Sequence, residues 1–193
     1  DRALADIDRA LKLRPVDGAL LVLRSQVYQA RGQHAEAVAD IDAVLKRIPV
    51  DANRVRANYL NMAAYSRAVG KLDLDKALTQ IDEALKHLPD ETALLDTRGF
   101  ILYQMGKFDQ ALPIMQSAVI GMEKNLAEWE QEKRLYSRRG GDLEAEEKRI
   151  YRSAAVIFYH RGLVLQAQDK AEQAAKDFAQ VRKWGFEPDE NLY

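Results

Sequence analysis

The chain contains no cysteine among its 193 residues, which excludes disulfide bonds and thiolate metal sites. It has no run of about 18 apolar residues, the length that a membrane-spanning helix needs. It also lacks an excess of one charge, because 29 Lys and Arg residues stand against 30 Asp and Glu residues. Proteins that bind nucleic acid or acidic membranes usually carry a clear basic excess. These absences argue against nucleic acid as a partner and against a membrane span.

Sequence patterns that mark common enzymes are absent too. There is no glycine-rich nucleotide loop, no nucleophile elbow and no HExxH zinc motif. The three histidines, His34, His87 and His160, do not have the spacing of metal ligands. We therefore expect no metal, no cofactor and no enzymatic activity. His34 and His87 are expected to be structural, whereas for His160 a structural role and a ligand contact both stay open.

What the chain does contain is a repeat. The segment ALADIDRALKLRP at 3–15 returns 34 residues later as AVADIDAVLKRIP at 37–49, and again as ALTQIDEALKHLP at 77–89. A fixed period of about 20 to 50 residues indicates a solenoid of stacked units. Apolar residues recur in each copy at steps of three and four, as in an amphipathic helix, and a proline closes it.

The acidic pairs Asp6/Asp8 and Asp40/Asp42 recur in register with this period. Paired carboxylates can serve acid–base chemistry or hold a metal ion. Because these pairs follow the repeat, we expect them to lie on solvated helix faces instead.

Each full unit reads as two amphipathic helices, and in three units the two helices share a pattern of small residues. A small residue in the first helix precedes one in the second by twelve positions, in the pairs Ser25/Ala37, Gly99/Ala111 and Gly162/Ala174. Small side chains allow two helices to approach closely. The sequence therefore predicts repeated helix–turn–helix units.

These units resemble tetratricopeptide repeats, which are 34-residue helix–turn–helix modules with a small residue in each helix. The matching residues are Leu21, Ser25, Tyr28, Ala37, Ile41 and Pro49 in one unit; Leu95, Gly99, Leu102, Ala111 and Met115 in another; and Phe158, Gly162, Leu165, Ala174 and Phe178 in the last. No unit has the family's tryptophan. The resemblance implies an all-α, right-handed superhelical solenoid.

The resemblance covers most of the chain and divides it into predicted segments. They are a half repeat at 1–17 (second helix only), repeats at 18–51, 52–91 (with insertions), 92–125 and 155–188, an extended helical hairpin at 123–154 and a tail at 189–193. The chain begins in the middle of a repeat, with Asp1 as the expected N-cap. We therefore expect it to be a piece of a longer protein, and its compartment is not predicted.

Several local features depart from the family pattern. In the 52–91 repeat the core set is either Tyr59, Met62 and Ala63 or Asn58, Met62 and Tyr65; we prefer the first, which places Gly70 at the turn. Asp90 is the expected N-cap of the next helix. The helix that contains Pro113 should start at about Phe108 or Asp109 and kink at the proline.

The largest departure is the predicted hairpin. No closing proline follows Val119, and the helical pattern continues to Gly140 and Gly141, after which Asp142 is the expected N-cap of another helix. Two lengthened helices would project by about 20 Å as an antiparallel pair. The residues expected to hold the pair together are Leu126, Trp129, Leu135, Tyr136, Leu143, Ile150 and Tyr151. Trp129 and Tyr136 either seal this hairpin or form a docking surface.

In tetratricopeptide repeat proteins the first helices line a concave face that binds extended peptides or partner helices. The resemblance thus implies a protein–protein interaction scaffold whose partner-binding residues are Gln26, Gln29, Asn61, Arg67, Asp96, Phe100, Tyr103, Tyr159, Leu163 and Gln166. Phe100, Tyr103 and Tyr159 are the expected aromatic anchors, although each could instead fill space between units. Val22, Gln26 and Asp96 do not supply the Lys, Asn and Arg clamp of the family's chaperone-tail receptors.

Two other functions stay open. The helix at 1–14 has an apolar face without its usual partner, so it could mediate self-association, as could the hairpin at 123–152. Alternatively, the chain could be an accessory repeat region of a longer, possibly enzymatic protein.

Overall fold

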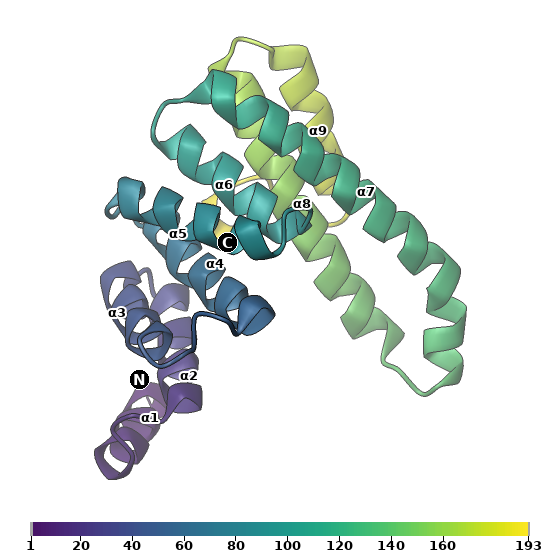
Figure 1. The fold of residues 1–193 in the computed structure, drawn as a ribbon. Coiled ribbons are helices and arrows are strands. Elements are labelled where there is room, and N and C mark those ends of the chain that lie inside the picture. The colour runs from purple at the N-terminus through teal and green to yellow at the C-terminus, as the bar shows by residue number, and fades with distance from the viewer. Residues whose placement is uncertain (1, 193) are drawn as a thin grey trace. The chain divides into compact units, whose positions relative to one another are not determined.

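The computed structural model describes residues 2–192, and this range consists of nine α-helices and a short terminal 3₁₀-helix, with no β-strand (Figure 1). The helices form two compact units, Asp1–Pro89 and Asp90–Tyr193. Asp1, the expected N-cap of the first helix, and Tyr193, the end of the predicted tail, lie outside the described residues. The all-helical repeat architecture agrees with the fold class expected from the sequence.

The first unit is built from helices that contact their neighbours in chain order. Its elements are α1 (Arg2–Leu13), α2 (Gly18–Ala30), α3 (His34–Leu45), α4 (Asn53–Val69) and α5 (Leu74–His87). Helices α2 and α3 form one packed pair and α4 and α5 another, while α3 also packs on α4 and α1 on α2. Helix α2 begins after Asp17, whose side chain accepts hydrogen bonds from the backbone N–H groups of Ala19 and Leu20.

Helix α1, the predicted half repeat, is part of the core of this unit. Ile7 and Leu11 are buried with Leu21 of α2 and Val44 of α3. The expectation that the helix at 1–14 has an uncovered apolar face is therefore wrong for Ile7 and Leu11. Leu13, at the end of α1, stays 82% exposed. Self-association through this helix remains a prediction.

Helix α4 has the register that we preferred from the sequence. Tyr59 packs against the core of the first unit, and Ala63 is fully buried. Asn58, which belongs to the other register, is exposed.

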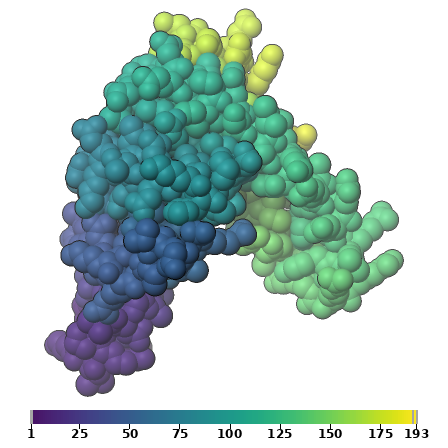
Figure 2. Space-filling model, in the orientation of Figure 1, coloured from purple at the N-terminus to yellow at the C-terminus, as the bar shows by residue number. Residues whose placement is uncertain are grey.

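The second unit contains the two lengthened helices. Its elements are α6 (Thr92–Gln104), α7 (Phe108–Arg138), α8 (Leu143–Ala167), α9 (Ala171–Lys183) and η1 (Glu190–Leu192). Helices α6 and α9 have 13 residues each, whereas α7 has 31 and α8 has 25. The core lies where α7, α8, α9 and η1 meet. Beyond this core, α7 and α8 continue side by side as a projecting hairpin (Figures 1 and 2).

Contacts between the two lengthened helices hold the hairpin together. The hydroxyl of Tyr151 on α8 donates to Glu130 on α7 at 3.2 Å, so a polar contact joins the two helices. Trp129 of α7 is only 8% exposed, and its ring meets that of Tyr136 on the same helix edge to face at a centroid distance of 5.4 Å. Of the two roles considered for Trp129, the structure supports sealing, because the buried indole does not form a docking surface. Self-association through the hairpin at 123–152 stays a prediction.

Two predicted helix starts were right and one was wrong. Helix α7 starts at Phe108 and runs as one helix through Pro113. Helix α8 starts after Asp142, whose side chain accepts from the backbone N–H of Ala145. The N-cap position of α6, however, is Glu91 rather than Asp90, and no side chain caps this helix.

Candidate functional site

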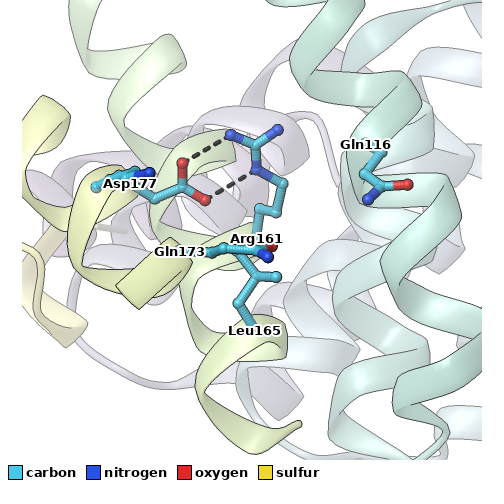
Figure 3. Close-up of a pocket in the computed structure, with 6 residues that line it drawn as sticks. Gln116, Arg161, Leu165, Gln173 and Asp177 are labelled. Atoms are coloured by element: carbon cyan, nitrogen blue, oxygen red, sulfur yellow. Dashed lines mark hydrogen bonds and ion pairs between the residues drawn. The ribbon is translucent and has the colours of Figure 1, made fainter. Parts of the chain in front are cut away.

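The second unit contains an open pocket of about 210 Å³ between three helices. One wall comes from α7, one from α8 and one from α9, and the lining residues are Gln116, Arg161, Leu165, Gln173, Lys176 and Asp177 (Figure 3). The lining combines two cations, one anion and two amides with a single aliphatic side chain. Such a surface can bind polar groups through hydrogen bonds and charge.

The centre of this pocket is an ion pair between α8 and α9. The guanidinium of Arg161 donates from Nε and Nη2 to the two carboxylate oxygens of Asp177, at 2.8 and 2.7 Å. Asp177 is almost completely buried, and the guanidinium carbon of Arg161 also lies 5.3 Å from the ring centroid of Phe158. Paired parallel hydrogen bonds of this kind hold a guanidinium in a fixed orientation. Arg161 is therefore a positioned side chain.

The third nitrogen of the guanidinium, Nη1, does not contact Asp177. Among residues 2–192, Nη1 of Arg161 has no hydrogen-bond acceptor, since all the polar contacts of Arg161 are those with Asp177. Figure 3 shows a terminal nitrogen of Arg161 pointing away from Asp177, on the side where Gln116 lies. The pocket thus presents a charged donor in a defined direction.

Sequence reasoning missed these residues although a signal existed. Arg161 and Asp177 are separated by 16 positions, and so are Arg24 and Asp40 in the first unit. Arg24 donates from Nε and Nη2 to Asp40 at 2.8 and 2.7 Å, which repeats the geometry of the second unit. The recurring Arg–Asp spacing therefore marks a structural ion pair within a repeat.

In the first unit, arginines also bind an aspartate of the preceding second helix. Nη1 of Arg24 donates to Asp8 of the preceding helix α1 at 2.8 Å. Asp42 of α3 accepts from Arg67 of the following helix α4 at 2.7 Å and from Lys76 at 3.0 Å. Burial alone would raise the pKa of Asp42, but hydrogen bonds from Arg67 and Lys76 outweigh it and lower the pKa.

The acidic pairs are thus not the solvated faces that we expected. Asp40 is 5% exposed and forms the ion pair with Arg24. Asp8 and Asp42 bind arginines of the following repeat, and only Asp6 is simply exposed. The recurrence of the aspartates reflects ion pairs that join successive helices.

The predicted concave-face residues differ widely in exposure. Gln26 and Gln166 are exposed, Gln29, Asn61, Tyr103 and Leu163 are half-buried, and Arg67, Asp96, Phe100 and Tyr159 are buried. In the first unit, Gln29 accepts a hydrogen bond from Ser66 at 2.6 Å, and Arg67 bonds to both Asp42 and Gln80. Arg67 is therefore engaged in contacts within its own unit.

Two of the three expected anchors in the second unit are internal. Phe100 is 1% exposed and its ring stacks on that of His160 at 4.0 Å. Nδ1 of the fully buried His160 lies 2.9 Å from Asp96. Tyr159 belongs to the core and its ring lies 6.0 Å from that of Phe178. Phe100 and Tyr159 therefore fill space in this conformation, and His160 has the structural role.

Two other kinds of site are not found among the described residues. No cluster of three or more His, Asp or Glu residues within 2–192 could hold a metal ion. None of the helices in the same range is long and apolar enough to cross a membrane.

Comparison with solved structures places the fold. A tetratricopeptide repeat protein from Parabacteroides merdae ATCC 43184 matches with a TM-score of 0.56 and 19% sequence identity, over 95% of this chain and 71% of that chain. The chain has the tetratricopeptide repeat fold. The helices α2–α3, α4–α5, α6–α7 and α8–α9 pack as successive pairs.

A second solved structure is less similar. The tetratricopeptide repeat protein YrrB, which has an unusual peptide-binding site, matches with a TM-score of 0.47 and 17% identity, over 96% of this chain and 94% of that chain. No family model and no curated protein matches the sequence.

Proposed function

We propose that the chain is a protein-interaction scaffold that binds a peptide or a partner helix, and that it is not an enzyme. The observation that carries this proposal is the open polar surface of the second unit, where positioned donors line a pocket between helices of a repeat fold. Hydrogen-bonding side chains on rigid helices are suited to hold a partner chain in one orientation.

The first helices of the second unit add a neighbouring surface. Tyr103 on α6 and Leu163 on α8 are half-buried, and Gln166 on α8 is exposed. Helices α6 and α8 contact each other, so these residues belong to adjacent first helices. A half-buried aromatic ring and an aliphatic side chain supply apolar contact area, and the amide can bond to a peptide backbone. In the first unit, Gln26, Gln29 and Asn61 are the remaining candidates.

A peptide-library selection tests the proposal. Phage-displayed random peptides are selected on the immobilised chain, and the affinity of enriched peptides is measured by fluorescence polarisation. We expect a sequence-specific peptide to bind with one-to-one stoichiometry. The double variant Leu163→Ala/Gln166→Ala should weaken the affinity for this peptide by about tenfold, since truncating a hot-spot residue costs more than about 1 kcal/mol of binding free energy.

A matched control uses a distant surface of the same unit. Arg134→Ala changes an exposed residue on the projecting part of α7 and should leave the affinity unchanged. Circular dichroism of each variant shows whether the fold is kept. A selection that enriches no peptide contradicts the proposed function, whereas peptides that bind the double variant as tightly as the parent contradict the α6–α8 surface.

A further inference from the structure

Resting on the proposed function, we propose that the pocket beside Arg161 binds the carboxylate of an Asp or Glu side chain from an acidic peptide. The inference comes from a comparison between two repeats of the same chain. Arg24 and Arg161 make the same two hydrogen bonds to an aspartate of their own repeat. Arg24 has a third bond, from Nη1 to Asp8, and Arg161 does not.

The register of the repeat identifies the residue that replaces the missing acceptor. Asp8 follows Ala3 by five positions, and Asp42 follows Ala37 by five. In the 92–125 repeat the corresponding small residue is Ala111, and the residue five positions later is Gln116. Helix α7, the second helix that precedes Arg161, therefore carries a neutral amide where α1 and α3 carry a carboxylate bound to an arginine of the next repeat.

The pocket lies between this amide and the arginine. Gln116 and Arg161 both line it, and no hydrogen bond joins them. Its volume of about 210 Å³ far exceeds the roughly 10–15 Å³ that one water molecule needs, so an entire acidic side chain can enter. In Figure 3 Arg161 lies between Asp177 and Gln116, with Asp177 on one side of the guanidinium and the amide on the other.

The charge of the lining favours an anion. Arg161 and Lys176 contribute two positive charges and Asp177 one negative charge, which leaves a net charge of +1 on the lining residues. The amides of Gln116 and Gln173 can donate to the same carboxylate or to the peptide backbone. An arginine of this fold can bind two carboxylates at once, since Arg24 donates to both Asp40 and Asp8. Hydrogen bonds between guanidinium and carboxylate are stronger than neutral ones.

The occupant that fits is an acidic side chain carried by another chain. In the first unit the equivalent carboxylates belong to aspartate side chains on helices, at 2.8 Å for Asp8 and 2.7 Å for Asp42 from their arginine nitrogens. A peptide Asp or Glu can reproduce this contact. Leu165 in the pocket lining gives the methylene part of that acidic side chain an apolar surface to contact.

Nuclear magnetic resonance of the ¹⁵N-labelled chain tests the proposal directly. The probe is a short peptide of Ala, Ser and Glu, and its partner is the same peptide with Gln in place of Glu. We expect the Glu peptide to shift the Arg161 Nε–Hε signal and the side-chain amide signals of Gln116 and Gln173. The Gln peptide should bind about tenfold more weakly or not at all, as expected for losing hydrogen bonds to a charged group.

Two variants at one position make the test specific. Gln116→Asp restores the internal carboxylate, so it should occupy Arg161 and weaken the Glu peptide by about tenfold or more. Gln116→Ala removes one amide donor but leaves Arg161 open to the peptide, so it should weaken the Glu peptide much less than Gln116→Asp does. Both changes lie at an exposed residue, whereas truncation of Arg161 would leave the buried Asp177 unpaired.

The outcomes separate this inference from the proposed function. If the Glu and Gln peptides bind equally, or if Gln116→Asp binds the Glu peptide as tightly as Gln116→Ala does, the carboxylate site is wrong. Should library-selected peptides still bind the chain and respond to Leu163→Ala/Gln166→Ala, the scaffold function would stand without this pocket. A failure of both experiments would remove both proposals.

Discussion

Gly70, at the end of α4, lies so close to His34 at the start of α3 that no side chain fits between them. A Cβ atom built on Gly70 would lie 2.6 Å from the Cβ of His34. The backbone of Gly70 has φ −78° and ψ −2°, which any residue can adopt. The glycine is therefore required by the approach of two helices and not by backbone conformation.

Replacing Gly70 with alanine should destabilise the first unit by about 1–3 kcal/mol, the usual cost of overpacking. The nearest atom is a Cβ, which cannot move without its backbone, so rotation of the histidine ring does not relieve the clash. The measurement is the free energy of unfolding from urea titration followed by circular dichroism.

Gly18, the first residue of α2, provides the matched control. A Cβ at this glycine meets no atom within 4 Å, so Gly18→Ala should leave stability unchanged or raise it by up to about 1 kcal/mol. The double variant Gly70→Ala/His34→Gly removes the opposing Cβ and should recover part of the loss, which a double-mutant cycle would show. Equal stabilities for Gly70→Ala and Gly18→Ala would refute the packing explanation.

The features that could be predicted from the sequence are those encoded locally. The 34-residue period, the closing prolines and the uninterrupted helical pattern after Val119 each lie within one or two helices, and they predicted the repeats and the hairpin. The role of Gly70 was different. Its position next to a turn suggested a turn glycine, and only the distance to His34 shows that packing demands it.

The candidate site was less accessible to sequence reasoning. Phe100 and Tyr159 fall on first helices, but α6 and α8 each contact more than one other helix, so more than one face is buried. The periodicity of apolar residues predicts which face of a helix is buried, but it does not predict how many neighbouring helices pack on that helix. The spacing of 16 residues between Arg161 and Asp177 was visible in the sequence, whereas the pocket beside Gln116 is visible only in the structure.

The ion pairs of Arg24 allow a prediction about two aspartates with different burial. Asp40 is 7% exposed at its side chain and Asp8 is 46% exposed. Asp40→Ala should lower the free energy of unfolding by about 2–3 kcal/mol. This is somewhat below the usual loss for breaking a buried pair, because Arg24 is partly exposed to solvent and still binds Asp8. Asp8→Ala should cost less than about 1 kcal/mol, as for surface pairs. Urea unfolding of both variants at neutral pH measures the difference.

Arg24 is the partner in both variants and keeps one aspartate in each, so the comparison sets a buried aspartate against a more exposed one on the same arginine. Replacing Asp40 with asparagine keeps its shape and tests whether charge or packing accounts for the loss. Losses of equal size for Asp8→Ala and Asp40→Ala would show that burial does not set the strength of these pairs.

The ion pairs of Asp42 should make the first unit sensitive to acid. Burial would raise the pKa of Asp42, but hydrogen bonds from Arg67 and Lys76 lower it below its ordinary value of 3.8. A carboxyl whose pKa is lower in the folded state stabilises the fold above its ordinary pKa. This contribution is lost as the pH falls from about 4 through the lowered pKa, because the folded chain must then bind a proton that breaks the pairs.

The Asp42→Asn variant tests this pH dependence, because it cannot titrate at this position. We expect it to be less stable than the parent at about pH 7, and we expect the difference to shrink as the pH approaches about 3. The control is Asp6→Asn, which changes an exposed aspartate on α1 and should keep the pH profile of the parent. Free energies of unfolding are measured by urea titration across this pH range. If the Asp42→Asn and parent profiles run parallel, the lowered pKa of Asp42 does not contribute to stability, and the acid sensitivity of the unit must arise from other carboxylates.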